Sequence, residues 1–119
     1  MAIAVPGSSG FIGTAICRLL TSVGQPFRIV DQKPSPVFGD GVQVADIRDI
    51  AALRQAVSGD CILHLAAVHR DDVRPVSLYD DINVQGTRNI CAVAVEKGIN
   101  RIVFASSVAI YGFAPAGTD

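Results

Sequence analysis

Three glycines, Gly7, Gly10 and Gly13, stand three residues apart between a short apolar run and the beginning of a helical pattern. The apolar run over residues 3–5 has the length and β-branched content of a strand. After it, apolar side chains recur at the spacing of a helix with one buried stripe: Ile12, Ala15, Ile16, Leu19, Leu20 and Val23. A strand, a tight turn and a helix in this order predict the first half of a βαβ unit.

In such a turn each glycine has its own mechanical role. The first allows the tight turn, the second lets the backbone approach a pyrophosphate, and the third lets the helix touch the strand. The phosphates would lie at the amino end of the helix, where free N–H groups and the helix dipole favour an anion. The alternative is a tight turn that binds no ligand.

Short apolar runs and helical patterns alternate along the rest of the chain. Further strands are predicted over residues 27–30, 42–44, 61–65 and 102–105, and further helices from Asp49 to Gly59 and from residue 77 or 78 to Lys97. Because the strands are apolar on both faces, we expect a parallel sheet covered by helices on both sides. Right-handed connections, with a change of direction after the third strand, give the strand order 3-2-1-4-5. The predicted fold is a Rossmann-type, doubly wound α/β domain with three layers, in which the sheet lies between two layers of helices (αβα).

The long third helix carries one predicted buried side and one internal glycine. That side consists of Ile82, Gln85, Asn89, Ala92 and Val93. Gly86 costs about 1 kcal/mol against alanine inside a helix, so we expect it to permit close packing or the close approach of a ligand.

Length and charge limit the classes of partner. A chain of 119 residues has room for one domain, spanning 1–119. With 18% charged residues and a formal net charge of -1, it offers no basic surface for nucleic acid, so we expect a small-molecule partner. Its apolar runs are too short to span a membrane, and because the first strand begins almost at Met1 we expect no leader to be cleaved.

The cysteines and histidines suggest no metal or redox site. Cys17, Cys61 and Cys91 are widely spaced among apolar neighbours, and there is no CxxC pair. We predict buried thiols in a reducing, cytoplasmic protein. His64, within a predicted strand, is expected to be a hydrogen-bonded core histidine, and neither it nor His69 has a second ligand at metal spacing.

Asp31 ends the second predicted strand, 18 residues after Gly13. An acid near this position receives the adenosine ribose hydroxyls of a dinucleotide. Its carboxylate would repel a 2'-phosphate, which favours NAD over NADP, although Lys33 could move to meet a phosphate. The alternative is a solvated loop acid.

Five further features join the glycine spacing: Asp31, "DIRD" (46–49), "HLAA" (64–67), "NVQGTRN" (83–89) and "SSVAIYG" (106–112). From Ile3 to Gly112, in order and spacing, the chain resembles the extended short-chain dehydrogenase/reductase family. Within that family it is most similar to the nucleotide-sugar epimerases and dehydratases, the group to which UDP-glucose 4-epimerase belongs. The resemblance implies an NAD cofactor and a nucleotide-sugar substrate.

Most of the implied site residues contact the cofactor. Asp46 would accept a hydrogen bond from the adenine amine while Ile47 packs on the ring, unless they are simply a helix-start acid and a core residue. His69 matches a lysine that holds the nicotinamide ribose, but it is a weaker donor, and a solvated loop histidine is an equal alternative. Asn83 would brace the backbone after the fourth strand, as a buried amide must find partners. The full implied cofactor-binding set is Gly7, Ser9, Gly10, Phe11, Ile12, Gly13, Asp31, Asp46, Ile47, Leu65, Ala66, Ala67, His69 and Asn83.

The catalytic residues are less complete. Ser107 matches the family's catalytic Ser/Thr, whose hydroxyl bonds the sugar C4 oxygen. Tyr111 is not the family's base, which belongs to a Tyr-x-x-x-Lys pair, because position 115 is Pro115. That pair, the sixth strand and the substrate domain are absent from these residues. We therefore expect an N-terminal, cofactor-binding part of a longer enzyme that turns nothing over by itself.

Other interpretations remain open at this point. A sensor or regulatory protein could keep the dinucleotide site without catalysis, and a flavodoxin-like or phosphoacceptor domain is a weaker third possibility. Pro6, where the family usually has threonine, predicts a stiffer loop that still binds the cofactor. The helix over 78–97 resembles one that forms dimers in the family, and the fifth strand would leave an unpaired apolar edge prone to self-association.

Overall fold

Five parallel strands form one sheet in the computed structural model, which describes residues 2–8, 10–32, 43–66 and 77–106. The strands are β1 (Ile3–Pro6), β2 (Phe27–Asp31), β3 (Gln43–Val44), β4 (Cys61–His64) and β5 (Ile102–Phe104). Their order is β3-β2-β1-β4-β5, with Ile3 aligned with both Phe27 and Cys61. The predicted strand order 3-2-1-4-5 is confirmed.

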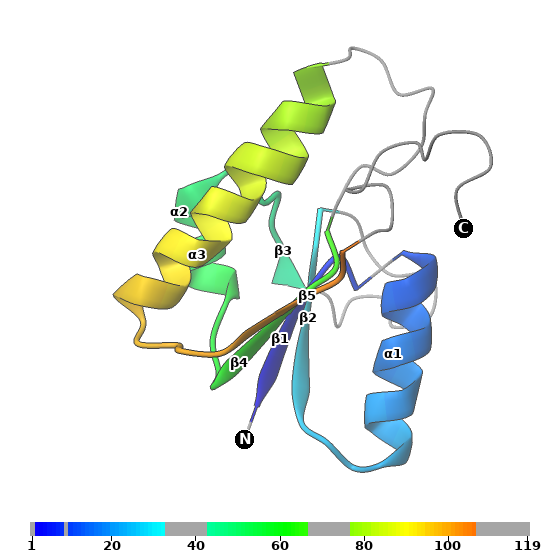
Figure 1. Ribbon diagram of the computed structural model, residues 1–119. Coiled ribbons are helices and arrows are strands. Elements are labelled where there is room, and N and C mark those ends of the chain that lie inside the picture. Colours follow the sequence, from blue (N-terminus) through cyan, green and yellow to red (C-terminus); the bar gives the residue numbers. More distant parts are fainter. Residues whose placement is uncertain (1, 9, 33–42, 67–76, 107–119) are drawn as a thin grey trace, which may run out of the picture.

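Helices cover both faces of the sheet (Figure 1). The helix α1 (Phe11–Ser22) lies on one face, and α2 (Ile50–Ala56) lies on the other beside a continuous helix made of η1 (Tyr79–Gly86) and α3 (Thr87–Glu96). Side chains alternate along each strand. Ala4, Val30 and Ile62 therefore join the larger core cluster under α2 and α3, while Val5 and Ile29 join the smaller one under α1. This arrangement confirms the predicted three-layer αβα architecture.

The helix ends follow local chemistry. Asp49 caps α2, because its carboxylate accepts a hydrogen bond of 3.2 Å from the backbone N–H of Ala52. The prediction that this helix continues to Gly59 was wrong. It ends at Ala56, because Val57 takes up extended backbone (φ -87°, ψ 124°) and is itself buried.

The long helix over 77–97 differs from the prediction in its pitch. Residues 79–86 form η1, a π-helix of eight residues, and α3 after it is α-helical. A π-helix has a wider turn than an α-helix, so the buried side no longer follows the 3.6-residue spacing assumed from the sequence. Asn89 and Val93 are buried as predicted, but Gln85 is exposed, and the buried residues of this helix also include Gly86, Ile90 and Ala94.

The cysteine prediction was right for two residues and wrong for the third. Cys17 and Cys61 are buried, and burial raises the pKa of the Cys17 thiol to about 11. Cys91 is exposed, because it follows the buried Ile90 directly and therefore points away from the sheet on α3.

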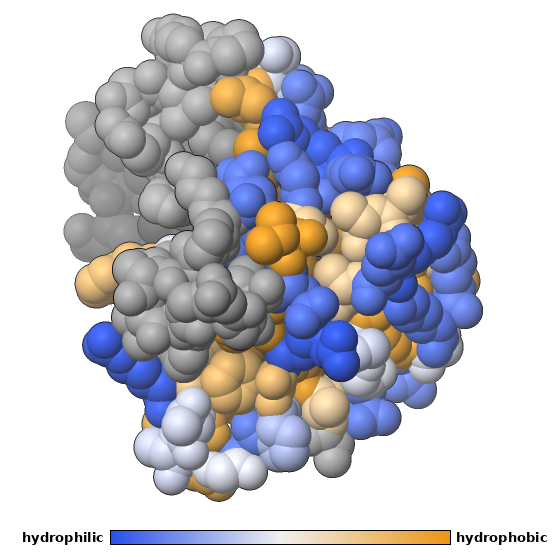
Figure 2. Space-filling model, turned by 180° about the vertical axis from the view of Figure 1, so that it is seen from behind, coloured by the Kyte–Doolittle hydropathy of each residue, from blue (hydrophilic) through white to orange (hydrophobic). Residues whose placement is uncertain are grey.

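Two features of the surface complete the fold. On the side of α2 and α3, at the right of Figure 2, hydrophilic residues predominate. β5 pairs with β4 alone among the described strands, and its side chains Ile102, Val103 and Phe104 are 38–53% exposed. No helix in the described part of the chain is long and apolar enough to cross a membrane.

Candidate functional site

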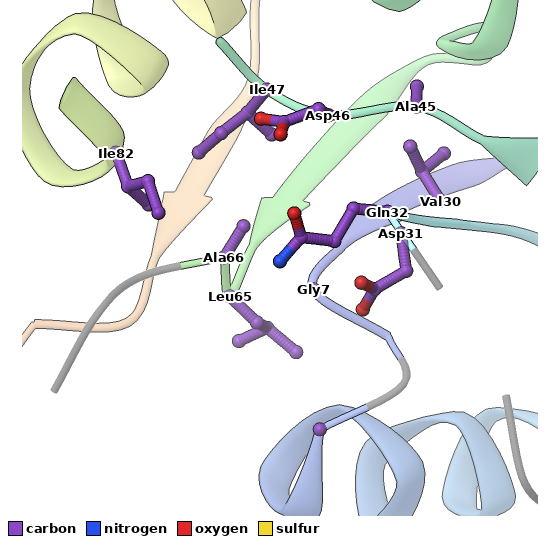
Figure 3. Close-up of a pocket in the computed structure, with 11 residues that line it drawn as sticks. Gly7, Val30, Asp31, Gln32, Ala45, Asp46, Ile47, Leu65, Ala66 and Ile82 are labelled. Carbon is purple, nitrogen blue, oxygen red and sulfur yellow. The ribbon is translucent and has the colours of Figure 1, made fainter. Parts of the chain in front are cut away.

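A cavity of about 180 Å³ opens at the carboxyl ends of the central strands. This is where ligands bind in doubly wound sheets, at the point where the strand order changes direction between β1 and β4. Figure 3 shows its wall, which is formed by the ends of β1, β2 and β4, the segment after β3 and one residue of η1. The lining residues are Gly7, Gly10, Val30, Asp31, Gln32, Ala45, Asp46, Ile47, Leu65, Ala66 and Ile82.

The turn after β1 is compressed between two neighbouring strands. The backbone N–H of Gly7 donates to Val30 O at 2.9 Å, and the N–H of Leu65 donates to Pro6 O at 2.8 Å. Gly7 has φ +87°, and a Cβ on it would lie 2.4 Å from Ala66 N. Only glycine fits this position, for both reasons.

The other two glycines differ from Gly7 and from each other. A Cβ on Gly13 would lie 2.3 Å from Gly7 O and 2.7 Å from Ser8 Cα, so this glycine lets α1 touch the turn. At Gly10 the nearest atom to a Cβ is Gly7 O at 3.7 Å, and the residue is exposed and lines the cavity. The roles predicted for Gly7, a tight turn, and for Gly13, close contact of helix and strand, therefore agree with this geometry, and Gly10 faces open space.

The amino end of α1 is suited to an anion. Gly10, the N-cap residue of α1, has no side chain that could cap the helix, and the first turn of α1 contains no acidic residue. Uncapped N–H groups and the positive end of the helix dipole therefore face the cavity mouth beside Gly10. Phe11 and Ile12, which are 93% and 59% exposed, contribute no side chain to the lining.

One end of the cavity is polar and the other is apolar. Asp31, the last residue of β2, is half-buried and lines the cavity. The side chain of Gln32, the next residue, extends across the opening of the cavity (Figure 3). At the opposite end the side chains of Ile47 and Ile82 extend toward each other. An anion beside Gly10, a hydroxyl group beside Asp31 and a flat apolar group beside Ile47 would together fill the cavity.

Asp46 is already engaged by a neighbour. Its carboxylate accepts from Arg48 through the backbone N–H at 2.9 Å, through Nε at 3.0 and 3.1 Å, and through Nη2 at 2.5 Å. The hydrogen bond from the Arg48 side chain holds the pKa of Asp46 below its usual value. Asp46 therefore stays ionised and fixed in orientation at the rim.

The segment that carries Asp46 and Ile47 is fastened to the long helix. The Asn89 side chain, 7% exposed, donates from Nδ2 to Ile47 O at 2.9 Å. The Ile47 side chain lies so close to Gly86 that a Cβ there would be 2.4 Å from Ile47 Cδ1. Gly86 therefore permits close packing, which was one of its two predicted roles.

His64 lies outside the cavity, on the face of the sheet that α3 covers. Its Nε2 is 2.9 Å from Thr87 Oγ1, and burial lowers the pKa of the imidazole to about 4. Nδ1 is buried without a hydrogen-bond partner in the described structure. The expectation of a hydrogen-bonded core histidine thus holds for one ring nitrogen and was wrong for the other.

Seven of the fifteen predicted site residues come together in the cavity. These are Gly7, Gly10, Asp31, Asp46, Ile47, Leu65 and Ala66. Phe11, Ile12, Gly13 and Asn83 are described but do not line it, and Asn83 is half-buried on η1. Ser9, Ala67, His69 and Ser107 lie outside the described residues, as do Lys33 and Tyr111.

Four lining residues were not predicted from the sequence: Val30, Gln32, Ala45 and Ile82. The first three adjoin Asp31 or Asp46, so the carboxyl ends of β2 and β3 could have indicated them. Ile82 had no such signal, because it was assigned to the buried side of a regular helix. Among the described residues, no group of three or more His, Cys, Asp or Glu side chains could hold a metal ion.

Comparison with known proteins shows which family this chain resembles in sequence. The profile of the NAD dependent epimerase/dehydratase family matches residues 3–119. The chain is 49% identical over 109 residues to the N-acetyl-alpha-D-glucosaminyl-diphospho-ditrans,octacis-undecaprenol 4-epimerase of Escherichia coli O157:H7. That match covers 89% of this chain and 32% of the relative, so the chain spans about a third of the length of the relative.

Solved structures agree on the fold. A short-chain dehydrogenase/reductase superfamily protein from Agrobacterium tumefaciens with bound NAD has a TM-score of 0.84 and 34% identity, over 94% of this chain and 34% of its own. The UDP-glucose 4-epimerase of Thermus thermophilus in complex with NAD has a TM-score of 0.84 and 28% identity, over 99% of this chain and 42% of its own.

Proposed function

Since the chain belongs to the NAD-dependent epimerase/dehydratase family, we propose that it is the NAD-binding part of a longer enzyme that acts on nucleotide sugars. The observation that carries this proposal is the cavity at the change of strand order. It combines an uncapped helix end beside Gly10, a carboxylate at Asp31 and an apolar end at Ile47. The NAD bound in two similar structures supports the choice of cofactor.

The dinucleotide would lie across the cavity with its pyrophosphate near α1 and its adenine near Ile47. Its pyrophosphate rests at the amino end of α1, the adenosine ribose bonds Asp31, and adenine lies against Ile47 beside Asp46. Leu65 and Ala66 give it a smooth backbone surface at the end of β4, which Ala67 and His69 would continue toward the nicotinamide. Ser9, Phe11, Ile12 and Gly13 contribute backbone at the turn, and Asn83 braces this part of the site.

The reaction that we propose for the longer enzyme is transient hydride transfer at a sugar carbon. Bound NAD supplies the hydride acceptor, and the protein supplies orientation and acid–base groups. Ser107 would hydrogen-bond the sugar C4 oxygen. The names of two similar proteins, both 4-epimerases of diphosphate-linked sugars, support C4 as the reacting carbon. No tyrosine in these 119 residues has a lysine four positions later, so this chain alone should not turn over a sugar.

Calorimetric titration of the chain with NAD, NADH and NADP tests the cofactor proposal. NAD should bind more tightly than NADP, because the Asp31 carboxylate repels a 2'-phosphate. Asp31→Asn should weaken NAD binding by about tenfold and narrow the difference from NADP, since a charged hydrogen bond becomes a neutral one.

The matched control is Asp60→Asn, at the amino end of β4 and therefore at the opposite edge of the sheet from the cavity. The Asp60 side chain accepts from Ala2 N at 2.9 Å, a bond that an asparagine oxygen can keep. Both variants change the net charge equally, so only Asp31→Asn should alter NAD binding. Equal effects of the two variants, or no dinucleotide binding by the wild type, would refute the proposed site.

Turnover of a nucleotide sugar by the intact protein separates this proposal from a non-catalytic sensor. Binding of NAD without turnover would favour the sensor.

A reducing, cytoplasmic setting is part of the proposal and is supported by Cys17, Cys61 and Cys91, none of which forms a disulfide.

We also propose a homodimer through the helix over 78–97. Its support is the exposure of apolar side chains on that helix, Val84 at 45% and Val95 at 80%. Light scattering at high protein concentration tests it, and a monomer throughout would contradict it.

A further inference from the structure

We propose that Asn89 is the positioning residue for the adenine end of the cavity, and that through Ile47 it determines how well the site distinguishes adenine from other bases. The inference rests on the proposed binding of NAD. Asn89 does not line the cavity, and the sequence suggested only that it belongs to the buried side of a helix.

The contact between Asn89 and Ile47 joins two distant parts of the chain. The Asn89 amide is 7% exposed, and its Nδ2 donates to Ile47 O at 2.9 Å, across 42 positions of sequence. Gln85 Nε2 donates to the Asn89 oxygen at 3.1 Å, which directs the amide nitrogen toward Ile47. A buried backbone carbonyl that loses its donor pays a desolvation cost, so the segment would move to find another partner.

The same helix holds Ile47 at a second point. Gly86 leaves the space that the Ile47 side chain fills, with less room than a Cβ needs. Seven positions before Asn89, Ile82 places its own side chain against the cavity, opposite Ile47 (Figure 3). Ile82, Gly86 and Asn89 therefore fix the apolar end of the cavity from a single helix.

Asp46 makes the position of this segment matter for recognition. Its carboxylate is held by Arg48, two residues along the same segment, and cannot reorient without breaking those bonds. The place of the carboxylate relative to the cavity is therefore determined by the backbone of residues 46–48. Asn89 anchors that backbone at its centre.

The test is the preference of the full chain for AMP over IMP, measured by calorimetry. IMP replaces the adenine amine, a donor, with a carbonyl, so a correctly placed Asp46 should favour AMP by about tenfold. Asn89→Leu removes the donor at similar volume and should reduce this preference to less than about threefold.

Val93→Ala is the matched control, because Val93 is fully buried on the same helix, one turn later, and does not line the cavity. It should lower stability but leave the AMP preference unchanged. A merely structural role for Asn89 would give the same pattern as Val93→Ala, and that result would overturn the inference.

Gly86→Ala gives an independent test if Asn89→Leu does not fold. Alanine favours the helix but pushes against Ile47, so the AMP preference should again fall. A wild-type chain that binds AMP selectively, with selectivity kept in the variants that fold, would overturn the inference while NAD binding stands. A wild-type chain that binds neither NAD nor AMP would overturn both.

Discussion

The two ends of the cavity are built in opposite ways. At the end beside α1, the backbone approaches itself because side chains are missing at Gly7 and Gly13. At the end beside η1 and α3, side chains interlock: Asn89 holds the Ile47 carbonyl, and Arg48 holds Asp46. The first end depends on space, whereas the second depends on hydrogen bonds and charge. Their responses to mutation and to pH should differ accordingly.

Gly7→Ala should have the largest effect on the backbone-built end. The new Cβ would meet Ala66 N at 2.4 Å, and the residue would keep a left-handed backbone at φ +87°. Left-handed strain and overpacking together should cost about 3 to 5 kcal/mol of the free energy of unfolding and abolish NAD binding. Urea unfolding and calorimetry measure the two effects.

Gly10→Ala separates space from ligand approach at the same end. Its Cβ would have no neighbour nearer than 3.7 Å, so the fold should keep its stability within about 0.5 kcal/mol. NAD binding should still weaken, because the methyl group would stand where the pyrophosphate approaches. If Gly10→Ala destabilised the chain as much as Gly7→Ala, the assignment of separate roles would be wrong.

His64, on the face of the sheet that α3 covers, should make the free energy of unfolding depend on pH. The folded state holds its pKa at about 4, below the ordinary value of 6.5, because the imidazole is buried. Between these values the unfolded chain binds the proton more readily, so stability is full above pH 6.5 and falls as the pH decreases. The free energy of unfolding should drop by about 2 kcal/mol from pH 7 to pH 5, and by about 3 kcal/mol in all once the pH is below 4.

Urea unfolding at several pH values, compared with His64→Gln, measures this term. Both proteins keep the other histidine, His69, so the difference between the two pH profiles belongs to His64. The variant should be less stable at pH 7 and less sensitive to acid. Parallel profiles would show that His64 is not the group responsible.

The sequence indicated cavity residues at both ends, Gly7 and Gly10 at one and Asp46 and Ile47 at the other, but not the contact that fastens the side-chain end. Strand bounds agreed within one residue in the described chain, and Gly7, Gly10 and Asp31 line the cavity as expected. These features are local, since a glycine spacing or a strand end can be recognised within a few residues. The hydrogen bond from Asn89 to Ile47 joins residues 42 positions apart, and no local sequence pattern predicts it.

The change from π-helix to α-helix limits prediction in the same region. A single period of 3.6 residues cannot describe both η1 and α3, so the buried side inferred for the whole helix was correct at Asn89 and Val93 and wrong at Gln85. Ile82 escaped notice as a lining residue for the same reason, because its direction depends on the pitch of η1.

The smallest effect is expected where side chains join the two helices on the surface. Arg54 on α2 bonds Glu96 on α3 through Nε at 2.8 Å and Nη2 at 3.0 Å, but both side chains are more than 40% exposed. Water and salt screen such a pair, and ordering two long side chains has an entropic cost. Arg54→Ala should therefore change neither the Tm in about 150 mM salt nor the AMP preference beyond experimental error. A clear loss of AMP preference would mean that the docking of α2 on α3, rather than the buried bond from Asn89, positions the adenine end, and the contrast between the two ends would have to be redrawn.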